Sequence, residues 1–101
     1  MIAVARNCPV GVDLEKIRED LDIAPLLRRL GETNLPDLSV PGLYHRWTQR
    51  EARSKAAGAA LFDTPREDSH AVDVSAPDGY AASVALIGEN PVVRYCDAGN
   101  L

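Results

Sequence analysis

The sequence predicts an α+β fold, an antiparallel sheet with one main helix packed on it. Apolar and polar residues alternate over residues 10–15 and 70–75, as in strands that bury one face. Residues 80–87 follow the second of these segments after the strong turn sequence Ala76-Pro77-Asp78-Gly79, which predicts a hairpin. Residues 43–60 are rich in alanine and straight-chain residues and contain no proline, which favours a helix.

The other elements are shorter. Residues 23–30 are expected to form a short helix, with Pro25 in its first turn and Gly31 at its end. Residues 33–42 contain two prolines and read as a loop. Three further segments are predicted to be a short strand, a turn, and a strand that closes a three-stranded meander: residues 1–6, 7–9 and 92–95.

Length and composition limit the possible classes of protein. A chain of 101 residues has room for one domain, 1–101. A net charge of -4 argues against non-specific binding to nucleic acid or to an anionic membrane, because both require a basic surface. Cys8 and Cys96 have no zinc-type spacing and read as reduced structural thiols, and no segment is apolar enough to span a membrane. A cytoplasmic location is expected.

Two carboxylates share one face of the first alternating segment. Successive side chains of a strand point to opposite faces, so Asp13 and Glu15 point the same way as Gly11. Carboxylates at that spacing repel each other unless a cation lies between them, and oxygen ligands without His or Cys favour Mg²⁺ or Mn²⁺. The alternative is an exposed strand edge at which both groups face water.

The predicted main helix adds a carboxylate and an ammonium group one turn apart, Glu51 and Lys55. They could be an ordinary surface ion pair. If instead Glu51 meets Asp13 and Glu15, three carboxylates can hold a metal while Lys55 neutralises phosphate oxygens. A helical projection places these residues on one face: Leu43, Tyr44, Trp47, Glu51, Ser54, Lys55 and Gly58. A small-residue stripe is expected beside and behind it: Ala52, Ala56 and Ala59.

Basic residues gather in the same helix. Residues 44–58 contain Arg46, Arg50, Arg53 and Lys55 against Glu51 alone, so this stretch could meet an acidic partner or a polyphosphate. The alternative is a solvated helix face whose arginines serve solubility. Two histidines lack metal-ligand spacing and are expected to be structural or exposed: His45 and His70.

Two segments together carry a family resemblance. Gly11-Val12-Asp13-Leu14-Glu15, followed by Trp47-Thr48-Gln49-Arg50-Glu51-Ala52-Arg53-Ser54-Lys55-Ala56-Ala57-Gly58, resembles the 4'-phosphopantetheinyl transferase family, in particular its Sfp-like branch. The segment 73–86, with its Pro-Asp-Gly-Tyr turn, is similar to the strand pair that follows the family's helix. The resemblance covers most of the chain.

The resemblance implies magnesium-dependent transfer of phosphopantetheine from coenzyme A to a serine of an acyl or peptidyl carrier protein. Asp13, Glu15 and Glu51 would be the metal ligands. Glu51 would also help to deprotonate the serine, and Lys55 would contact the pyrophosphate of the coenzyme, so these two residues are the catalytic candidates. Arg50 joins Lys55 as a coenzyme-binding candidate, and the basic stretch around Arg46, Arg50 and Arg53 would meet the acidic helix of the carrier protein.

The resemblance also bears on completeness. Sfp-like enzymes have two similar lobes, and this chain corresponds to the second lobe alone. Its relatives with one lobe, the holo-acyl-carrier-protein synthases, complete their sites across a homotrimer. Three hypotheses therefore remain open: a lobe that is active in a homo-oligomer or with a separate first lobe, an inactive truncated lobe, and a non-catalytic module that binds a carrier protein.

Overall fold

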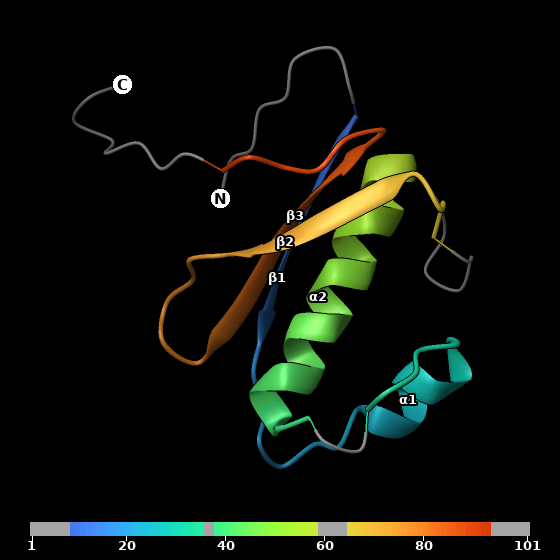
Figure 1. Cartoon of the computed structure of the whole chain (residues 1–101). Coiled ribbons are helices and arrows are strands. Elements are labelled where there is room, and N and C mark those ends of the chain that lie inside the picture. The colour runs from blue at the N-terminus through green and yellow to red at the C-terminus, as the bar shows by residue number, and fades with distance from the viewer. Residues whose placement is uncertain (1–8, 36–37, 59–64, 94–101) are drawn as a thin grey trace, which may run out of the picture.

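The computed structural model describes residues 9–35, 38–58 and 65–93, which form an α+β unit (Figure 1). The strands β1 (Val10–Lys16), β3 (Tyr80–Ile87) and β2 (Ser69–Val74) lie side by side in that order, and both pairs are antiparallel. The long helix α2 (Val40–Ala57) crosses one face of this sheet, and the short helix α1 (Ala24–Arg29) lies beside the beginning of α2. The predicted fold class is confirmed at this level.

The hairpin between β2 and β3 forms where the turn sequence predicts it. The Tyr80 amide donates to the Pro77 carbonyl at 3.0 Å, and Gly79 adopts a φ of +81°, which a residue with a Cβ rarely adopts. The rest of the predicted meander is wrong, because Val92 and Val93 are not in a strand and β1 occupies the place beside β3. The rest of the 92–95 strand, the strand over 1–6 and most of the turn over 7–9 lie outside the described residues.

The ends of α2 differ from the prediction. The helix begins at Val40 because the Ser39 hydroxyl accepts a hydrogen bond from the Gly42 amide at 3.2 Å, and Pro41 is compatible with the first helical turn. It ends before Gly58, whose φ of +65° is left-handed. The predicted helix over 43–60 therefore began three residues late, and its last three positions were wrong or lie outside the described residues.

The face of α2 that meets the sheet also differs from the projected one. Ala52 and Ala56 lie against the sheet, and a Cβ on Gly11 would overlap the Ala52 carbonyl oxygen and the Ala56 amide nitrogen. Helix and strand thus approach backbone to backbone, which the small residues permit. Ala52 and Ala56 of the expected small-residue stripe are thus the contact itself, and Ala59 lies outside the described residues. Glu51 and Lys55 consequently lie toward the edge of the contact.

A second apolar cluster joins α1 to the beginning of α2 and to β3. Its core consists of Ile23, Leu27, Leu35, Leu43, Tyr44 and Ala81. Pro25 lies in the first turn of α1, and Gly31 follows the helix with a φ of +89°, as the sequence predicts. The opposite face of the sheet has no described helix over it, and Leu14 there is 44% exposed. Neither described helix has the length and hydropathy needed to cross a membrane.

Candidate functional site

The first part of the site comes from β1. Its pairing with β3 turns Gly11, Asp13 and Glu15 toward α2, as the predicted alternation requires, and leaves Val12 and Leu14 on the other face. The Asp13 side chain is only 4% exposed. A carboxylate buried to that extent is costly unless a cation or several donors accompany it, so its partners decide the chemistry of the site.

The main partner of Asp13 is Lys55, which reaches across from the last turn of α2. Lys55 Nζ lies 2.7 Å from Asp13 Oδ1, a short charge-assisted hydrogen bond. The Lys55 side chain is 53% exposed, so its ammonium group is accessible from solvent while it holds the buried acid. The structure thus brings these two predicted site residues into direct contact.

Glu51 lies one helical turn before Lys55 and is half-buried. Burial is the largest effect on its pKa and raises it; the negative charge of Asp13 raises it further, and the Lys55 and Arg50 cations only partly oppose this. A carboxylate in that position is a stronger base than an ordinary exposed glutamate, because it holds a proton more tightly.

Glu15 belongs to the same group. Burial raises its pKa most, and the negative charges of Asp13 and then of Glu51 act in the same direction. A hydrogen bond with the Trp47 side chain acts against them. The three predicted metal ligands therefore lie close enough to influence each other's ionisation. We call Asp13, Glu15, Glu51 and Lys55 the acidic cluster.

Two oxygens of the acidic cluster are buried without a partner. Asp13 Oδ2 and Glu51 Oε1 accept no hydrogen bond within the described part of the chain. Unpartnered buried carboxylate oxygens and an all-oxygen donor set suit a hard cation such as Mg²⁺. As the side chains stand, however, no three or more His, Cys, Asp or Glu groups of residues 9–35, 38–58 and 65–93 are gathered so that they could hold a metal. Lys55 instead neutralises Asp13 Oδ1.

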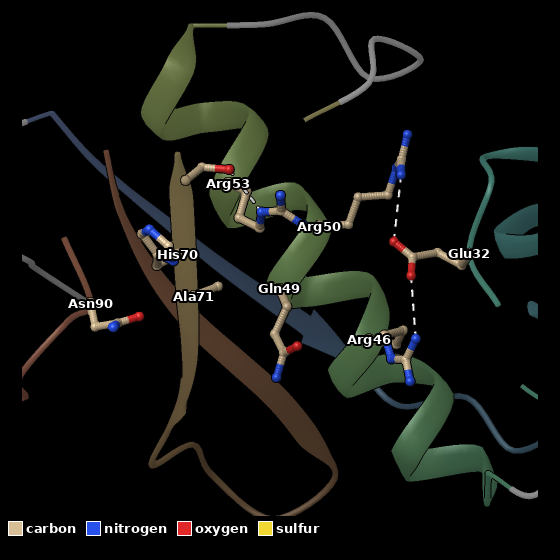
Figure 2. Close-up of a pocket in the computed structure, with 9 residues that line it drawn as sticks. Glu32, Arg46, Gln49, Arg50, Arg53, His70, Ala71 and Asn90 are labelled. Atoms are coloured by element: carbon tan, nitrogen blue, oxygen red, sulfur yellow. Dashed lines mark hydrogen bonds and ion pairs between the residues drawn. The ribbon is translucent and has the colours of Figure 1, made fainter. Parts of the chain in front are cut away.

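The arginines of α2 lie on its other flank, facing α1 and β2 (Figure 2). Arg46 and Arg50 extend to Glu32, with closest contacts of 3.3 and 3.5 Å, and the Arg50 side chain is only 5% exposed. Arg53 Nε donates to the Ser69 hydroxyl on β2 at 2.8 Å. Arg50 thus contacts Glu32 away from the acidic cluster, and the three arginines are not the freely solvated face that was the alternative in the sequence.

A polar network that the sequence analysis missed ties α2 to β2 and β3. The buried hydroxyls of Thr48 and Ser83 lie 2.9 Å apart, and Ser83 Oγ donates to Asp73 Oδ1 at 3.1 Å. Gln49 Nε2 donates to the same oxygen at 2.9 Å, and His45 Nδ1 lies 3.3 Å from it. His45 is therefore a structural histidine, as expected. The available signal was Ser83, a polar residue at an inward-facing position of an otherwise apolar strand.

Comparisons with known proteins add no relative. The chain matches no protein-family model, no curated protein and no solved structure. The chemistry of the acidic cluster must therefore be inferred from its own geometry.

Proposed function

We propose that this chain is a lobe of the 4'-phosphopantetheinyl transferase fold and that it transfers 4'-phosphopantetheine from coenzyme A to a serine of an apo acyl or peptidyl carrier protein. One observation supports this most: the acidic cluster places three interacting carboxyl groups beside an exposed ammonium group, on a strand and a helix that carry the two matching motifs. The proposal includes a cytoplasmic location, where both substrates would be met.

The cluster contains the groups that phosphoryl transfer needs. Its residues Asp13, Glu15 and Glu51 would hold Mg²⁺, or Mn²⁺ in its place, and the ion would neutralise charge on the pyrophosphate. The two buried oxygens without a donor, Asp13 Oδ2 and Glu51 Oε1, support this assignment. Lys55 would turn from Asp13 to the pyrophosphate when the site is occupied, which its exposed side chain permits.

The chain's own residues then have distinct tasks. Lys55, released from Asp13, binds the pyrophosphate oxygens of coenzyme A. Glu51 also accepts the proton of the carrier serine hydroxyl. The serine oxygen forms a bond to the phosphorus that bears the pantetheine arm. The bond from that phosphorus to the bridging oxygen breaks, and adenosine 3',5'-bisphosphate leaves with the electron pair.

The proposal requires a second lobe, because the Sfp-like enzymes that the sequence resembles have two similar lobes and their single-lobe relatives complete their sites across a homotrimer. We propose that this lobe acts in a homo-oligomer or with a separate first lobe. An inactive lobe and a non-catalytic carrier-binding module are the competing outcomes of the test below.

The intact mass of an apo carrier protein tests the proposal. We expect incubation with this chain, coenzyme A and Mg²⁺ to add one phosphopantetheine group, and Glu51→Gln to abolish the gain while leaving the circular dichroism spectrum unchanged. Glu19→Gln removes a carboxylate at an exposed position and is the matched control, expected to transfer normally. No gain with any carrier protein, alone or with a supplied first lobe, would contradict the proposal. Carrier binding without transfer, unchanged by Asp13→Ala, would identify the non-catalytic module.

A further inference from the structure

A cavity of about 510 Å³ lies on the flank of α2 opposite the acidic cluster (Figure 2). It is bounded by α2, by β2 and by the segment after α1, and its volume is within the range of small-molecule sites. Its lining includes Glu32, Arg46, Gln49, Arg50, Arg53 and His70. We call it the arginine cavity.

The lining of the arginine cavity is strongly cationic. Among the described residues, the lining has three guanidinium groups and one carboxylate, that of Glu32, so with His70 counted as neutral their formal charge is +2. In a protein whose net charge is -4, this is a local reversal of sign. Cations gathered around a concave polar surface concentrate anions there, because the field is focused by the surrounding protein.

Arg53 is the clearest anion-binding group in the cavity. The partners of its guanidinium are neutral: the Ser69 hydroxyl at 2.8 Å and the Arg66 carbonyl at 3.1 Å. These bonds hold the group at the beginning of β2 without balancing its charge. Arg46 is held through Nη1 by the Glu32 carboxylate, which it shares with Arg50, and by the Thr33 carbonyl at 3.0 Å. A guanidinium has five N–H donors, so each side chain retains donors for a ligand after making these bonds.

We propose that the arginine cavity binds a compact dianion of the phosphate class, held between Arg46 and Arg53. Two oriented forks suit a tetrahedral oxyanion, because guanidinium groups bind phosphate oxygens in pairs. A charge of two matches the formal charge of the lining. The site is distinct from the acidic cluster, and the proposal does not rest on the transferase reaction.

An NMR titration of the unmodified protein tests the site directly. With inorganic phosphate at constant ionic strength, we expect saturable shifts of the side-chain Nε–Hε signals of Arg46 and Arg53. The exposed Arg28 and Arg18 should not shift, and sulfate should reproduce the effect whereas chloride should not. Shifts that increase linearly without saturation, or that are equal at all four arginines, would overturn the proposal.

Substitutions separate the cavity from the general charge of the protein. Arg46→Gln is expected to weaken phosphate binding about tenfold or more, the effect of losing hydrogen bonds to a charged group. Arg28→Gln removes the same charge from an exposed position of α1 and should leave the affinity unchanged. An equal loss in Arg28→Gln would mean non-specific attraction and would overturn the site.

A second probe identifies the source of the phosphate. The free amino acid phosphoserine carries the same dianion with an organic substituent. Tighter binding of phosphoserine than of inorganic phosphate would assign the cavity to a phosphate monoester, and the reverse order would assign it to the free ion. Either order supports the proposal, and absence of saturable binding by both probes contradicts it.

Discussion

The two flanks of α2 carry charges of opposite sign, and they differ in how those charges are paired. On the β1 flank lie three carboxyl groups, of which Asp13 pairs directly with Lys55, and two buried oxygens have no donor in the described chain. On the β2 flank, arginines share one carboxylate, Glu32, and also donate to hydroxyl and carbonyl oxygens at 2.8 to 3.1 Å. Both flanks are parts of one helix on one sheet.

The contrast separates structural charge from reactive charge. The arginines link α2 to its neighbours, because their many donors can satisfy backbone acceptors and still remain charged. The carboxylates of the β1 flank lack such partners. Burial and mutual repulsion therefore raise the pKa values of Glu15 and Glu51. Perturbed groups with unsatisfied oxygens mark the β1 flank as the candidate for chemistry.

The largest expected effect comes from breaking the contact that positions the β1 flank. Gly11→Ala would place a Cβ against the Ala52 carbonyl oxygen and the Ala56 amide nitrogen, and helix backbone cannot turn away as a side chain can. We expect the free energy of unfolding to fall by about 3 kcal/mol. Urea denaturation followed by circular dichroism measures it.

The control for this substitution is Gly42→Ala. Gly42 lies in the first turn of α2, and a Cβ there would meet side-chain atoms at about 3.4 Å, an ordinary contact. Alanine stabilises a helix relative to glycine by up to about 1 kcal/mol, so the same change should have the opposite sign. If both variants lost stability equally, the close approach of β1 and α2 would be wrong.

The β2 flank is tested by Glu32→Gln. The change keeps the shape and one acceptor but removes the negative charge that Arg46 and Arg50 share, and the Arg50 side chain is only 5% exposed. We expect a loss of about 2 kcal/mol in the free energy of unfolding. Asp20→Asn breaks an exposed pair with Arg18 and should cost at most about 0.5 kcal/mol. Equal small effects would mean that the β2 flank is not structural.

Local patterns were enough to predict the strand side of the acidic cluster. The period of two in β1 fixes Asp13 and Glu15 on the face of Gly11, and only one helix was long enough to cover that face. The hairpin could also be predicted from local sequence, because Gly79 adopts a turn conformation that few other residues adopt.

The helix side needed tertiary information. A helical projection orders side chains around an axis but does not say which stripe meets the sheet. The decisive fact is the missing Cβ of Gly11, which draws Ala52 and Ala56 inward. The role of Arg50 depended on Glu32, a residue 18 positions away in a segment with no periodicity. The start of α2 was missed because Pro41 and Gly42 look like loop residues unless Ser39 is recognised as the cap.

The next test removes Lys55, the cation that pairs directly with Asp13 on the β1 flank. Lys55→Gln deprives buried Asp13 of its ion pair, and we expect a loss of about 1 kcal/mol without added metal, because the lysine is partly exposed. Lys55 would compete with Mg²⁺ for Asp13, so the thermal shift produced by Mg²⁺ should be larger in this variant than in the original chain. Transfer should nevertheless fall. A smaller Mg²⁺ shift would indicate that Lys55 helps the metal to bind instead of competing with it.

The smallest expected effect is that of Glu51→Gln on the free energy of unfolding, and its sign is the most informative. Because the folded state raises the pKa of Glu51, it holds that proton more tightly than the unfolded chain does. The resulting stability is fully present below the ordinary glutamate pKa and is lost as the pH rises through the raised value. Above the raised pKa the ionised side chain opposes folding, so Glu51→Gln should stabilise the metal-free protein by up to about 1 kcal/mol, a small effect because the side chain is only half-buried.

Low pH should remove the stabilisation expected from Glu51→Gln, and added Mg²⁺ should reverse it. Below about pH 4 the carboxyl group is protonated in both states, so the stabilities of the two proteins should converge. With Mg²⁺ at pH 7 the original chain should gain stability and Glu51→Gln should not, because binding to the folded state alone stabilises it. Urea denaturation at both pH values, with EDTA and then with Mg²⁺, measures all of these effects. A Glu51→Gln variant that is less stable than the original chain at pH 7 in EDTA would mean that the Lys55 and Arg50 cations outweigh burial and the Asp13 charge. The charges of the β1 flank would then be as well paired as those of the β2 flank.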